Sequence, residues 1–548
     1  MTKRVEVFAL IGCSLFLSSC GGDITPTGSV SSASSSSSVS SASSSGSSSS
    51  SGASPTSTDV LTYHNDSART GQNLTETVLT PANVNSTTFG LKGILSADGL
   101  VDAAPLVVSN LSINGTAHNV VYVATENDSV YAYDADSLAL LKQVSLLGSG
   151  ETAASITGGC NQVAPLMGIT ATPVIDRGNG PHGTLFVVAM SQDTNGNAIQ
   201  RLHALDLVTL GDLTPAVSIQ ASTAGSGANA SNGMLTFDGR QYKERSALLL
   251  SGGLIYTTWA SNCDINPYNG WIIAYSEASL AQARVLNLTP NGTQGAIWNT
   301  GGLLDDGAGS LYGLLGNGTF DTQQDYGNAA VRISTAGATL TVADYFTPSN
   351  SVTESNGDVD FGSGSPMLLP TLTDASGTSR QLMFAAGKDG RIFLLDRTNL
   401  GSFNASVNQV YQLLSGALPG PMFSAPAYYN GVVYVGGVNA PLQAFALSNA
   451  QLPASATSKS ATTFSYPGSF PSVSGNGTSN GIVWAVETAG PAVLHAYNPA
   501  NLAQEYYNST QAGSRDSFGS GNKFITPVIA NGHVFVGTPS GVAVFGLQ

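Results

Sequence analysis

A unit of about 50 to 70 residues recurs along the chain, and this repetition limits the fold more than any other feature of the sequence. Each unit holds an apolar stretch opened by Pro, a Gly or Asn turn, an alternating strand, and a second strand ending in an Ala-aromatic-Asp-like triplet. Clear copies pair residues 104–107 with 131–134, and residues 172–175 with 203–206. We count eight such units, and a repeat of this kind indicates a propeller or a solenoid.

The strands within the units favour the propeller. Each strand is a run of about four to six β-branched, aromatic or alternating residues bounded by Gly, Asn or Pro, and no long window shows helical periodicity. Four-stranded units arranged as a closed ring leave no exposed sheet edges, whereas a linear stack of this polarity would. The sequence therefore predicts an all-β, eight-bladed β-propeller over residues 59–548.

The end of the chain makes a further prediction about how the ring closes. The final unit stops at Gln548, just after its third strand, so the outer strand of that blade must come from elsewhere. Residues 89–95 precede the first unit and can supply it. We therefore expect the last blade to be closed by an N-terminal strand.

The units resemble the pyrroloquinoline quinone (PQQ) repeat family, whose repeats read like Val-Tyr-Val, a Gly turn and Leu-Tyr-Ala-Leu-Asp. The resemblance covers residues 60–548 and implies a propeller like that of the quinoprotein alcohol dehydrogenases. Non-catalytic assembly scaffolds share the same repeat, so the resemblance is specific for fold rather than function. The family's Gly and Trp after the Asp are mostly lost here, as in residues 134–138.

Two motifs in the middle units resemble segments that carry chemistry in quinoprotein dehydrogenases. Residues 386–399 look like the segment whose Lys or Arg touches the quinone oxygens. The match falls on Lys388, where a cation would stabilise negative charge on a quinone accepting hydride. Residues 357–361 resemble the segment that bears the catalytic Asp, and this match falls on Asp360, which would take the alcohol proton beside Ca²⁺. The alternative is that Lys388 is an exposed turn residue, and that Asp358 and Asp360 cap turns.

Three more residues complete the site that the resemblance implies. Asn317 lies in a Gly-Asn segment similar to one that binds Ca²⁺, and Trp298 falls near the position of the Trp on which the quinone lies. Asp264 falls near the position of the family's Glu metal ligand. Asp264, Asn317 and Asp360 would together offer hard oxygen ligands to Ca²⁺. The adjacent Cys pair of many such dehydrogenases is missing, and no Cys-x-x-Cys-His haem motif is present.

The N-terminal region has the features of an export signal. Lys3 and Arg4 precede a short apolar core, and small residues lead to Cys20, which predicts a signal peptide over residues 1–19. The segment Leu-Ser-Ser-Cys resembles the lipobox of bacterial lipoproteins, with Cys20 as the lipidated residue. The alternative is an ordinary signal peptide with an accidental Cys. Gly21 after the cysteine resembles the pattern of outer-membrane rather than inner-membrane lipoproteins. The sequence leaves two alternatives for the face of that membrane, periplasmic or surface.

Residues 20–58 then form a Ser-rich tether that has almost nothing apolar to bury, so we expect a flexible spacer. The whole chain has 34 acidic and 19 basic residues, and a net charge of -15 argues against nucleic acid as a partner. Export would leave Cys160 and Cys263 in an oxidising compartment. A disulfide between them is one interpretation, and two free buried thiols are the other.

Two functions remain open on these observations. One is a lipid-anchored, PQQ- and Ca²⁺-dependent dehydrogenase of alcohols or sugars. The other is a non-catalytic scaffold or ligand-binding propeller of the cell envelope, whose partner would be an envelope protein. The ordered matches in the middle units favour the enzyme, whereas the missing Cys pair and the altered repeat motifs favour the scaffold.

Overall fold

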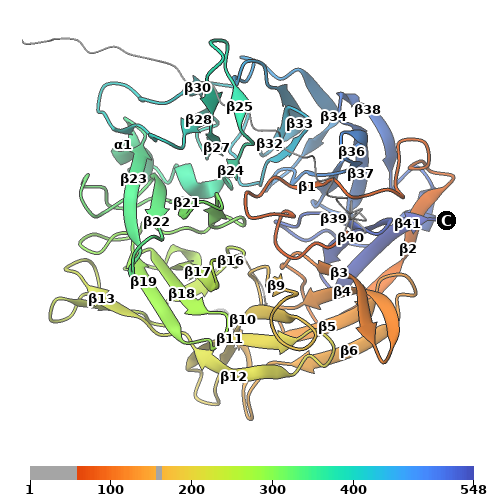
Figure 1. Ribbon diagram of the computed structural model, residues 1–548, viewed down its shortest axis with the longest axis horizontal. Coiled ribbons are helices and arrows are strands. Elements are labelled where there is room, and N and C mark those ends of the chain that lie inside the picture. Colours follow the sequence, from red (N-terminus) through yellow and green to blue (C-terminus); the bar gives the residue numbers. More distant parts are fainter. Residues whose placement is uncertain (1–57, 156–162, 164) are drawn as a thin grey trace, which may run out of the picture. The chain divides into compact units, whose positions relative to one another are not determined.

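The computed structural model describes residues 58–155, 163 and 165–548. These residues form eight antiparallel β-sheets arranged as the blades of a closed ring (Figure 1). The predicted eight-bladed β-propeller is therefore confirmed. The predicted signal peptide, Cys20, nearly all of the Ser-rich tether and Cys160 lie outside the described residues, as does the side chain of Cys263. The lipidation and the disulfide stay predictions.

Each blade has four principal strands that run outward from the axis in sequence order, except that the outermost strand of blade 8 precedes all the others. Blade 1 contains β3 (Leu106–Ile113), β4 (Thr116–Ala124), β5 (Ser129–Asp134) and β6 (Leu140–Ser145); blade 2 contains β9 (Val174–Asp176), β10 (Thr184–Gln192), β11 (Ala198–Asp206) and β12 (Asp212–Ser218); blade 3 contains β16 (Leu249–Ser251), β17 (Leu254–Ser261), β18 (Trp271–Ser276) and β19 (Gln282–Asn287); blade 4 contains β20 (Leu304–Asp305), β21 (Ser310–Leu314), β22 (Ala330–Ser334) and β23 (Thr341–Thr347). Blade 5 contains β24 (Met367–Leu368), β27 (Leu382–Ala386), β28 (Ile392–Asp396) and β30 (Gln412–Leu414); blade 6 contains β31 (Ala427–Tyr429), β32 (Val432–Gly436), β33 (Ala440–Ala446) and β34 (Ser458–Phe464); blade 7 contains β35 (Ser472–Asn476), β36 (Ser479–Glu487), β37 (Val493–Asn498) and β38 (Asn501–Asn508); blade 8 contains β39 (Val528–Ala530), β40 (His533–Thr538), β41 (Gly541–Leu547) and β2 (Phe89–Ser96).

Shorter elements extend the blades or lie in the loops between strands. They are β1 (Gln72–Asn73), β7 (Thr152–Ser155), β8 (Leu166–Met167), β13 (Ser222–Ala224), β14 (Met234–Thr236), β15 (Tyr242–Glu244), β25 (Leu372–Thr373), β26 (Ser379–Arg380), β29 (Ser402–Phe403), α1 (Ser351–Asn356) and the 3₁₀ helices η1 (Asn262–Asp264), η2 (Phe361–Ser363) and η3 (Gly513–Asp516). Among the described residues, no helix has the length and hydrophobicity needed to cross a membrane.

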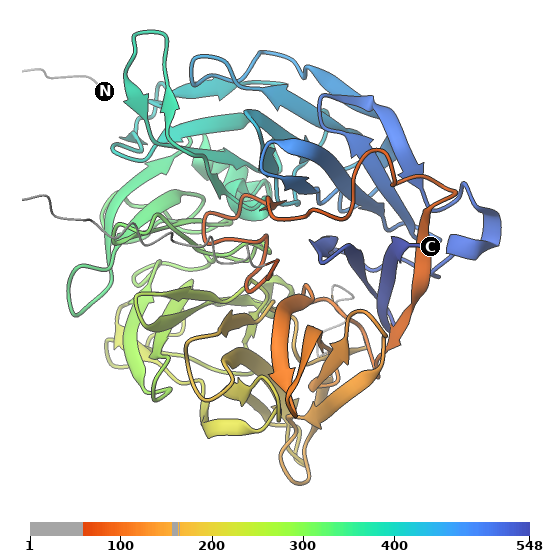
Figure 2. The same cartoon turned by 45° about the vertical axis from the view of Figure 1, so that its right-hand side comes forward.

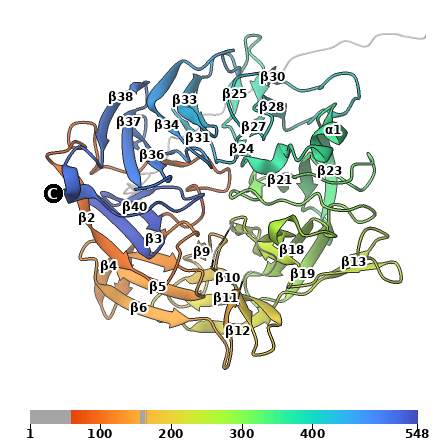
Figure 3. The ribbon, with the colours of Figure 1, turned by 180° about the vertical axis from the view of Figure 1, so that it is seen from behind.

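Apolar packing between neighbouring blades holds the ring together. In blade 1, all six residues of β5 are buried, whereas the outer strand β6 has no fully buried residue. The outer strands β6, β12, β19 and β38 lie at the rim in Figure 1 and, from behind, in Figure 3. The described residues form eight large apolar clusters, and each one joins two adjacent blades. Both faces of every sheet are therefore buried, which explains why many strands are continuous apolar runs rather than strict alternations.

The ring closes where the start of the propeller meets its end. Strand β2 pairs with β41 in an antiparallel ladder from Phe89 opposite Leu547 to Ser96 opposite Gly541. Phe89 is fully buried, and its ring lies 5.0 Å from that of Tyr507 and 5.6 Å from that of Trp484, both in blade 7. The predicted N-terminal closing strand is confirmed, and Phe89 also packs blade 8 against blade 7.

A second N-terminal segment, which we call the axial segment (residues 59–76), crosses the centre of the ring, as the red trace in Figure 2 shows. It forms hydrogen bonds at or beside the innermost strand of every blade. The bonds join Val60 to Val107, Leu61 to Ile175, Arg69 to Leu248, Ser67 to Asp305, Ala68 to Leu368, Thr70 to Tyr428, Gly71 to Val473 and Asn73 to Ile529, at distances of 2.7 to 3.1 Å. The axial segment therefore satisfies backbone groups that would otherwise face the channel unpaired.

Arg69 anchors this segment from a fully buried position. Its guanidinium donates hydrogen bonds to the carbonyl oxygens of Gly301 and Leu248, at 3.1 Å each, and to Thr62 and Tyr63 within its own segment. Burial lowers the pKa of Arg69 to about 10, so the side chain stays charged at neutral pH.

We predict that Phe89→Ala will lower the free energy of unfolding by about 3–5 kcal/mol, because it opens a cavity at the point of ring closure. Ile94→Ala is the matched control, since Ile94 lies in the same strand but its side chain is 41% exposed. It should change stability by less than about 1 kcal/mol. Urea unfolding curves followed by tryptophan fluorescence measure both values, and equal effects of the two substitutions would contradict closure through Phe89.

Candidate functional site

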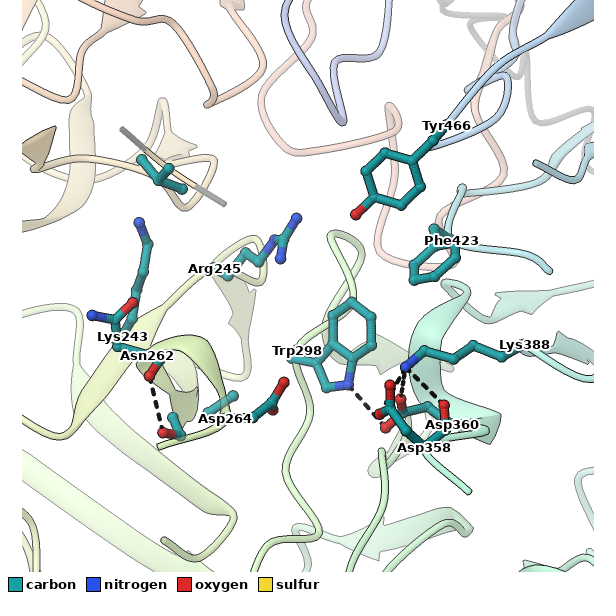
Figure 4. A pocket seen from close by; sticks show the side chains of 13 residues that line it. Lys243, Arg245, Asn262, Asp264, Trp298, Asp358, Asp360, Lys388, Phe423 and Tyr466 are labelled. Atoms are coloured by element: carbon teal, nitrogen blue, oxygen red, sulfur yellow. Dashed lines mark hydrogen bonds and ion pairs between the residues drawn. The ribbon is translucent and has the colours of Figure 1, made fainter. Parts of the chain in front are cut away.

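A cavity of about 240 Å³ lies among the loops of the middle blades. Its wall includes four of the five residues predicted for the cofactor and metal site: Asp264, Trp298, Asp360 and Lys388. Further described lining residues are Lys243, Arg245, Ala260, Ser261, Asn262, Asp358, Phe423 and Tyr466 (Figure 4). Residues that are far apart in the sequence thus line one cavity, and its wall combines titratable and aromatic side chains.

An ion-pair network forms one end of this cavity. The Lys388 ammonium lies 2.5 Å from Asp360 Oδ2 and 2.9 Å from Asp358 Oδ1. Asp360 Oδ1 accepts hydrogen bonds from the Asn317 backbone N–H at 2.7 Å and from the Trp298 indole N–H at 3.4 Å. Both side chains of the Lys388–Asp360 pair are largely buried, so this charge pair is held in a fixed geometry and poorly screened by water.

Two glycines allow this close approach. A Cβ on Gly316 would lie 2.5 Å from Asp360 Oδ1 and 2.6 Å from Trp298 Nε1. A Cβ on Gly387 would lie 2.4 Å from the Asp360 carbonyl oxygen, to which the Lys388 N–H donates a hydrogen bond of 2.9 Å. The backbone of blade 4 and the β27–β28 turn therefore contact the Asp360 loop directly, because only glycine leaves room for them.

The local charges shift the pKa values of this network. Burial alone would lower the pKa of Lys388, but the charges and hydrogen bonds of Asp360 and Asp358 outweigh it and raise the pKa. Burial would raise the pKa of Asp358, but hydrogen bonds from Lys388 and Asn317 lower it overall. Lys388 is thus charged at neutral pH and is not the solvated turn residue of the alternative interpretation.

Asp264 lies at the edge of the cavity, next to this network. Burial raises its pKa, and the negative charges of Asp360 and Asp358 raise it further. The Tyr268 hydroxyl donates a hydrogen bond of 3.3 Å to Asp264 Oδ1. Three carboxylates therefore share this end of the cavity with one ammonium group, and the excess of negative charge favours a bound cation.

Asn317 does not line the cavity but lies directly behind Asp360. Its side-chain N–H donates to Asp358 Oδ1 at 2.9 Å, while its side-chain oxygen is buried without a hydrogen-bond partner among the described residues. An unpaired amide oxygen beside carboxylates is a suitable donor for a hard cation such as Ca²⁺. Within the described part of the chain, no three His, Cys, Asp or Glu side chains are grouped closely enough to hold a metal alone. The donor chemistry of Asp264, Asn317 and Asp360 thus fits Ca²⁺ with part of its coordination shell completed by other oxygens.

The aromatic and basic residues of the cavity include several that the sequence reading missed. Trp298, half-buried, faces Phe423 at a ring-centre distance of 6.1 Å. The Arg245 guanidinium lies 3.9 Å from the ring centre of Phe524 and 5.7 Å from that of Trp298. The flat indole of Trp298, with cations on either side, suits a planar anionic ligand. Lys243 and Arg245 could have been noticed as two cations just before an apolar strand in a chain with only 10% charged residues.

No protein-family model and no curated protein sequence matches this chain. By structure, it is similar to the quinohemoprotein alcohol dehydrogenase from Comamonas testosteroni, with a TM-score of 0.60 and 14% identity over 89% of this chain and 80% of that one. A quinohemoprotein alcohol dehydrogenase from Pseudomonas putida HK5 gives a TM-score of 0.57 and 14% identity, over 89% and 80%. A europium-containing methanol dehydrogenase gives 0.54 and 14%, over 89% and 98%.

At this level of identity, the likeness shows a shared fold. The chain is therefore an eight-bladed β-propeller with the architecture of the quinoprotein alcohol dehydrogenases.

We predict that Lys388→Met will destabilise the protein by about 3 kcal/mol, because it leaves Asp360 buried without its counter-charge. The double variant Asp360→Asn with Lys388→Met should recover much of this loss, since it removes both charges. Lys459→Met, at an exposed position, is the control and should have no measurable effect. A double-mutant cycle from denaturant unfolding measures the coupling, and purely additive effects would show that the two charges do not interact.

Proposed function

We propose that this protein is a dehydrogenase that binds PQQ and Ca²⁺ in the cavity described above and oxidises an alcohol or a sugar. The observation that carries the proposal is the convergence of Trp298, Asp360 and Lys388, which come from separate loops, on one cavity. The architecture shared with quinoprotein dehydrogenases supports it.

In this proposal, Trp298 provides the flat apolar surface against which a planar quinone would lie. The Lys388 ammonium, 5.9 Å from the centre of the Trp298 ring, places positive charge at the edge of that surface. Bound PQQ would supply the oxidising chemistry, that of a hydride acceptor. Lys388 would stabilise the negative charge that develops there.

Asp360 is the residue placed to receive the alcohol proton. Its Oδ1 atom is fixed by hydrogen bonds from Asn317 and Trp298, which orients the carboxylate towards the cavity. Its ion pair with Lys388, 2.5 Å long, holds the other carboxylate oxygen in place. Asp264, Asn317 and Asp360 would hold Ca²⁺ through oxygen atoms, and the cation would relieve the repulsion among the carboxylates.

We further propose that the protein is anchored in the cell envelope through a lipid on Cys20, with the outer membrane as its location. The lipobox-like sequence and the Ser-rich tether support this part of the proposal.

The dehydrogenase proposal predicts that purified protein supplied with PQQ and Ca²⁺ will bind the quinone saturably, and that an alcohol or sugar will bleach its absorbance. Asp360→Asn should retain quinone binding, because Trp298 and Lys388 are unchanged, but should slow bleaching by about 10²- to 10⁴-fold. Asp136→Asn, at an exposed position away from the cavity, is the control and should keep the full rate. Absorbance titration and stopped-flow spectroscopy give both values. Absence of saturable binding would favour the non-catalytic scaffold.

The anchoring proposal predicts that the protein partitions with membranes after cell fractionation and that Cys20→Ala moves it into the soluble fraction. Ser19→Ala is the control, since it preserves the small residue before the cysteine. Metabolic labelling with a fatty-acid analogue should mark the parent protein and the control only. Labelling of the Cys20→Ala variant would contradict the assignment.

A further inference from the structure

Two cations, Lys243 and Arg245, form what we call the basic end of the cavity. Figure 4 shows them across Trp298 from Lys388. Lys243 is the middle residue of β15, opposite Ala260, and Arg245 follows directly after the strand ends at Glu244. Since side chains alternate along a strand, these two point to the same side, while Glu244 points into blade 3 and accepts a hydrogen bond from the Thr258 N–H at 3.2 Å. The local strand therefore delivers both cations to the cavity.

Lys243 is unusual because its ammonium group has no hydrogen-bond partner within the described part of the chain. The residue is 9% exposed, and its Nζ atom is buried without a hydrogen bond to any described residue. An ammonium group carries three donors, so leaving all of them unpaired is costly. Such a group inside a cavity calls for acceptor oxygens on a bound molecule.

The neighbouring carboxylates do not meet this need. Glu126 Oε1 accepts a hydrogen bond of 2.6 Å from the Thr170 hydroxyl, and its Oε2 accepts one of 2.7 Å from the Gly168 N–H. Asp102 accepts a hydrogen bond of 2.6 Å from Asn522, and burial together with the charge of Glu126 raises the pKa of Asp102 well above its usual range. These groups influence Lys243 through their charge but bond to other donors.

Arg245 adds a second positive charge to the same wall. Its guanidinium lies against the Phe524 ring at 3.9 Å, which fixes its plane. The side chains of Asn262 and Tyr466 also line the cavity. A group with two acceptor oxygens and one negative charge matches an ammonium and a guanidinium that line the same cavity.

We propose that Lys243 and Arg245 form a subsite that binds the carboxylate of a small acidic ligand. The role of this subsite in catalysis rests on the proposed function. It narrows the substrate class to an alcohol that also bears a carboxylate, such as a sugar acid or a hydroxy acid. The hydroxyl would lie at the Asp360 end of the cavity and the carboxylate at the basic end. PQQ itself carries carboxylates, so the quinone is the second source of the same chemistry.

The test compares D-glucuronate with D-glucose, which share a ring but differ in one carboxylate, by calorimetric titration of the purified protein without PQQ or metal. We expect glucuronate to bind at least about 10-fold more tightly than glucose. Lys243→Met should weaken glucuronate binding by about 10- to 100-fold. Lys243→Arg should preserve it, and Lys142→Met at an exposed position should leave it unchanged. Thermal unfolding of each variant checks that it is folded.

A second titration with PQQ distinguishes the two sources of the carboxylate. If Lys243→Met weakens the binding of glucuronate but not that of PQQ, the substrate supplies the carboxylate. If Lys243→Met weakens the binding of PQQ, and bound PQQ prevents glucuronate from binding, the quinone supplies the carboxylate. Either result supports the subsite. Equal affinities for glucuronate and glucose, with PQQ binding unaffected by Lys243→Met or Lys243→Arg, would overturn it. Because the glucuronate titration contains no quinone, its outcome is independent of whether the dehydrogenase proposal holds.

Discussion

The hydrogen bonds between the axial segment and the innermost strands are the interaction on which the rest of the structure depends. A propeller has no outer edge to protect once its ring is closed, but each blade still presents an inner edge to the axis. Unpaired backbone groups there would be costly if the channel were dry and would admit water if it were not. The axial segment forms hydrogen bonds at the inner edge of all eight blades. Buried Arg69 donates hydrogen bonds to carbonyl oxygens beside blades 3 and 4, and to Thr62 and Tyr63 of its own segment.

This constraint fixes the depth of the candidate site. Tyr63 of the axial segment lines a small cavity that shares Arg245 with the main one, so the segment forms a floor beneath the cluster of charged residues. The Trp298 and Asp360 loops lead into β20 and β24, and the backbone N–H groups of Asp305 and Leu368 in these strands donate hydrogen bonds to the axial segment. Gly316 and Gly387 then bring these loops and that of Lys388 into contact at distances that a Cβ would prevent.

The sequence predicted the parts of this arrangement that are local or repeated. Strands such as residues 120–124 and 131–134 could be predicted because each one carries the residue pattern of a strand within its own few residues. The last unit lacks a fourth strand, and residues 89–95 were predicted to supply it. Lys388 and Asp360 were found because each lies in a short contiguous motif. The axial segment and the basic end escaped notice because their partners are distant in sequence. Nothing near Lys243 in the sequence indicates that Glu126 accepts hydrogen bonds from Thr170 and Gly168, or that the Lys243 ammonium has no hydrogen-bond partner among the described residues.

The distribution of charge gives the cavity its polarity. The chain has 19 basic residues and a net charge of -15, yet three of those basic residues, Lys243, Arg245 and Lys388, line a single cavity of about 240 Å³. Lys388 is neutralised by Asp358 and Asp360, whereas Lys243 is not bonded to any described acid. The cavity therefore has an end rich in carboxylates, suited to a hard cation and a hydroxyl, and an opposite end suited to an anion. The net charge of the protein and the charge of an acidic ligand are both negative, so the basic end would not attract such ligands from a distance. It would set specificity at short range instead. A neutral alcohol would leave the Lys243 ammonium without an acceptor among the described residues, so selection between the two kinds of ligand follows from desolvation as much as from attraction.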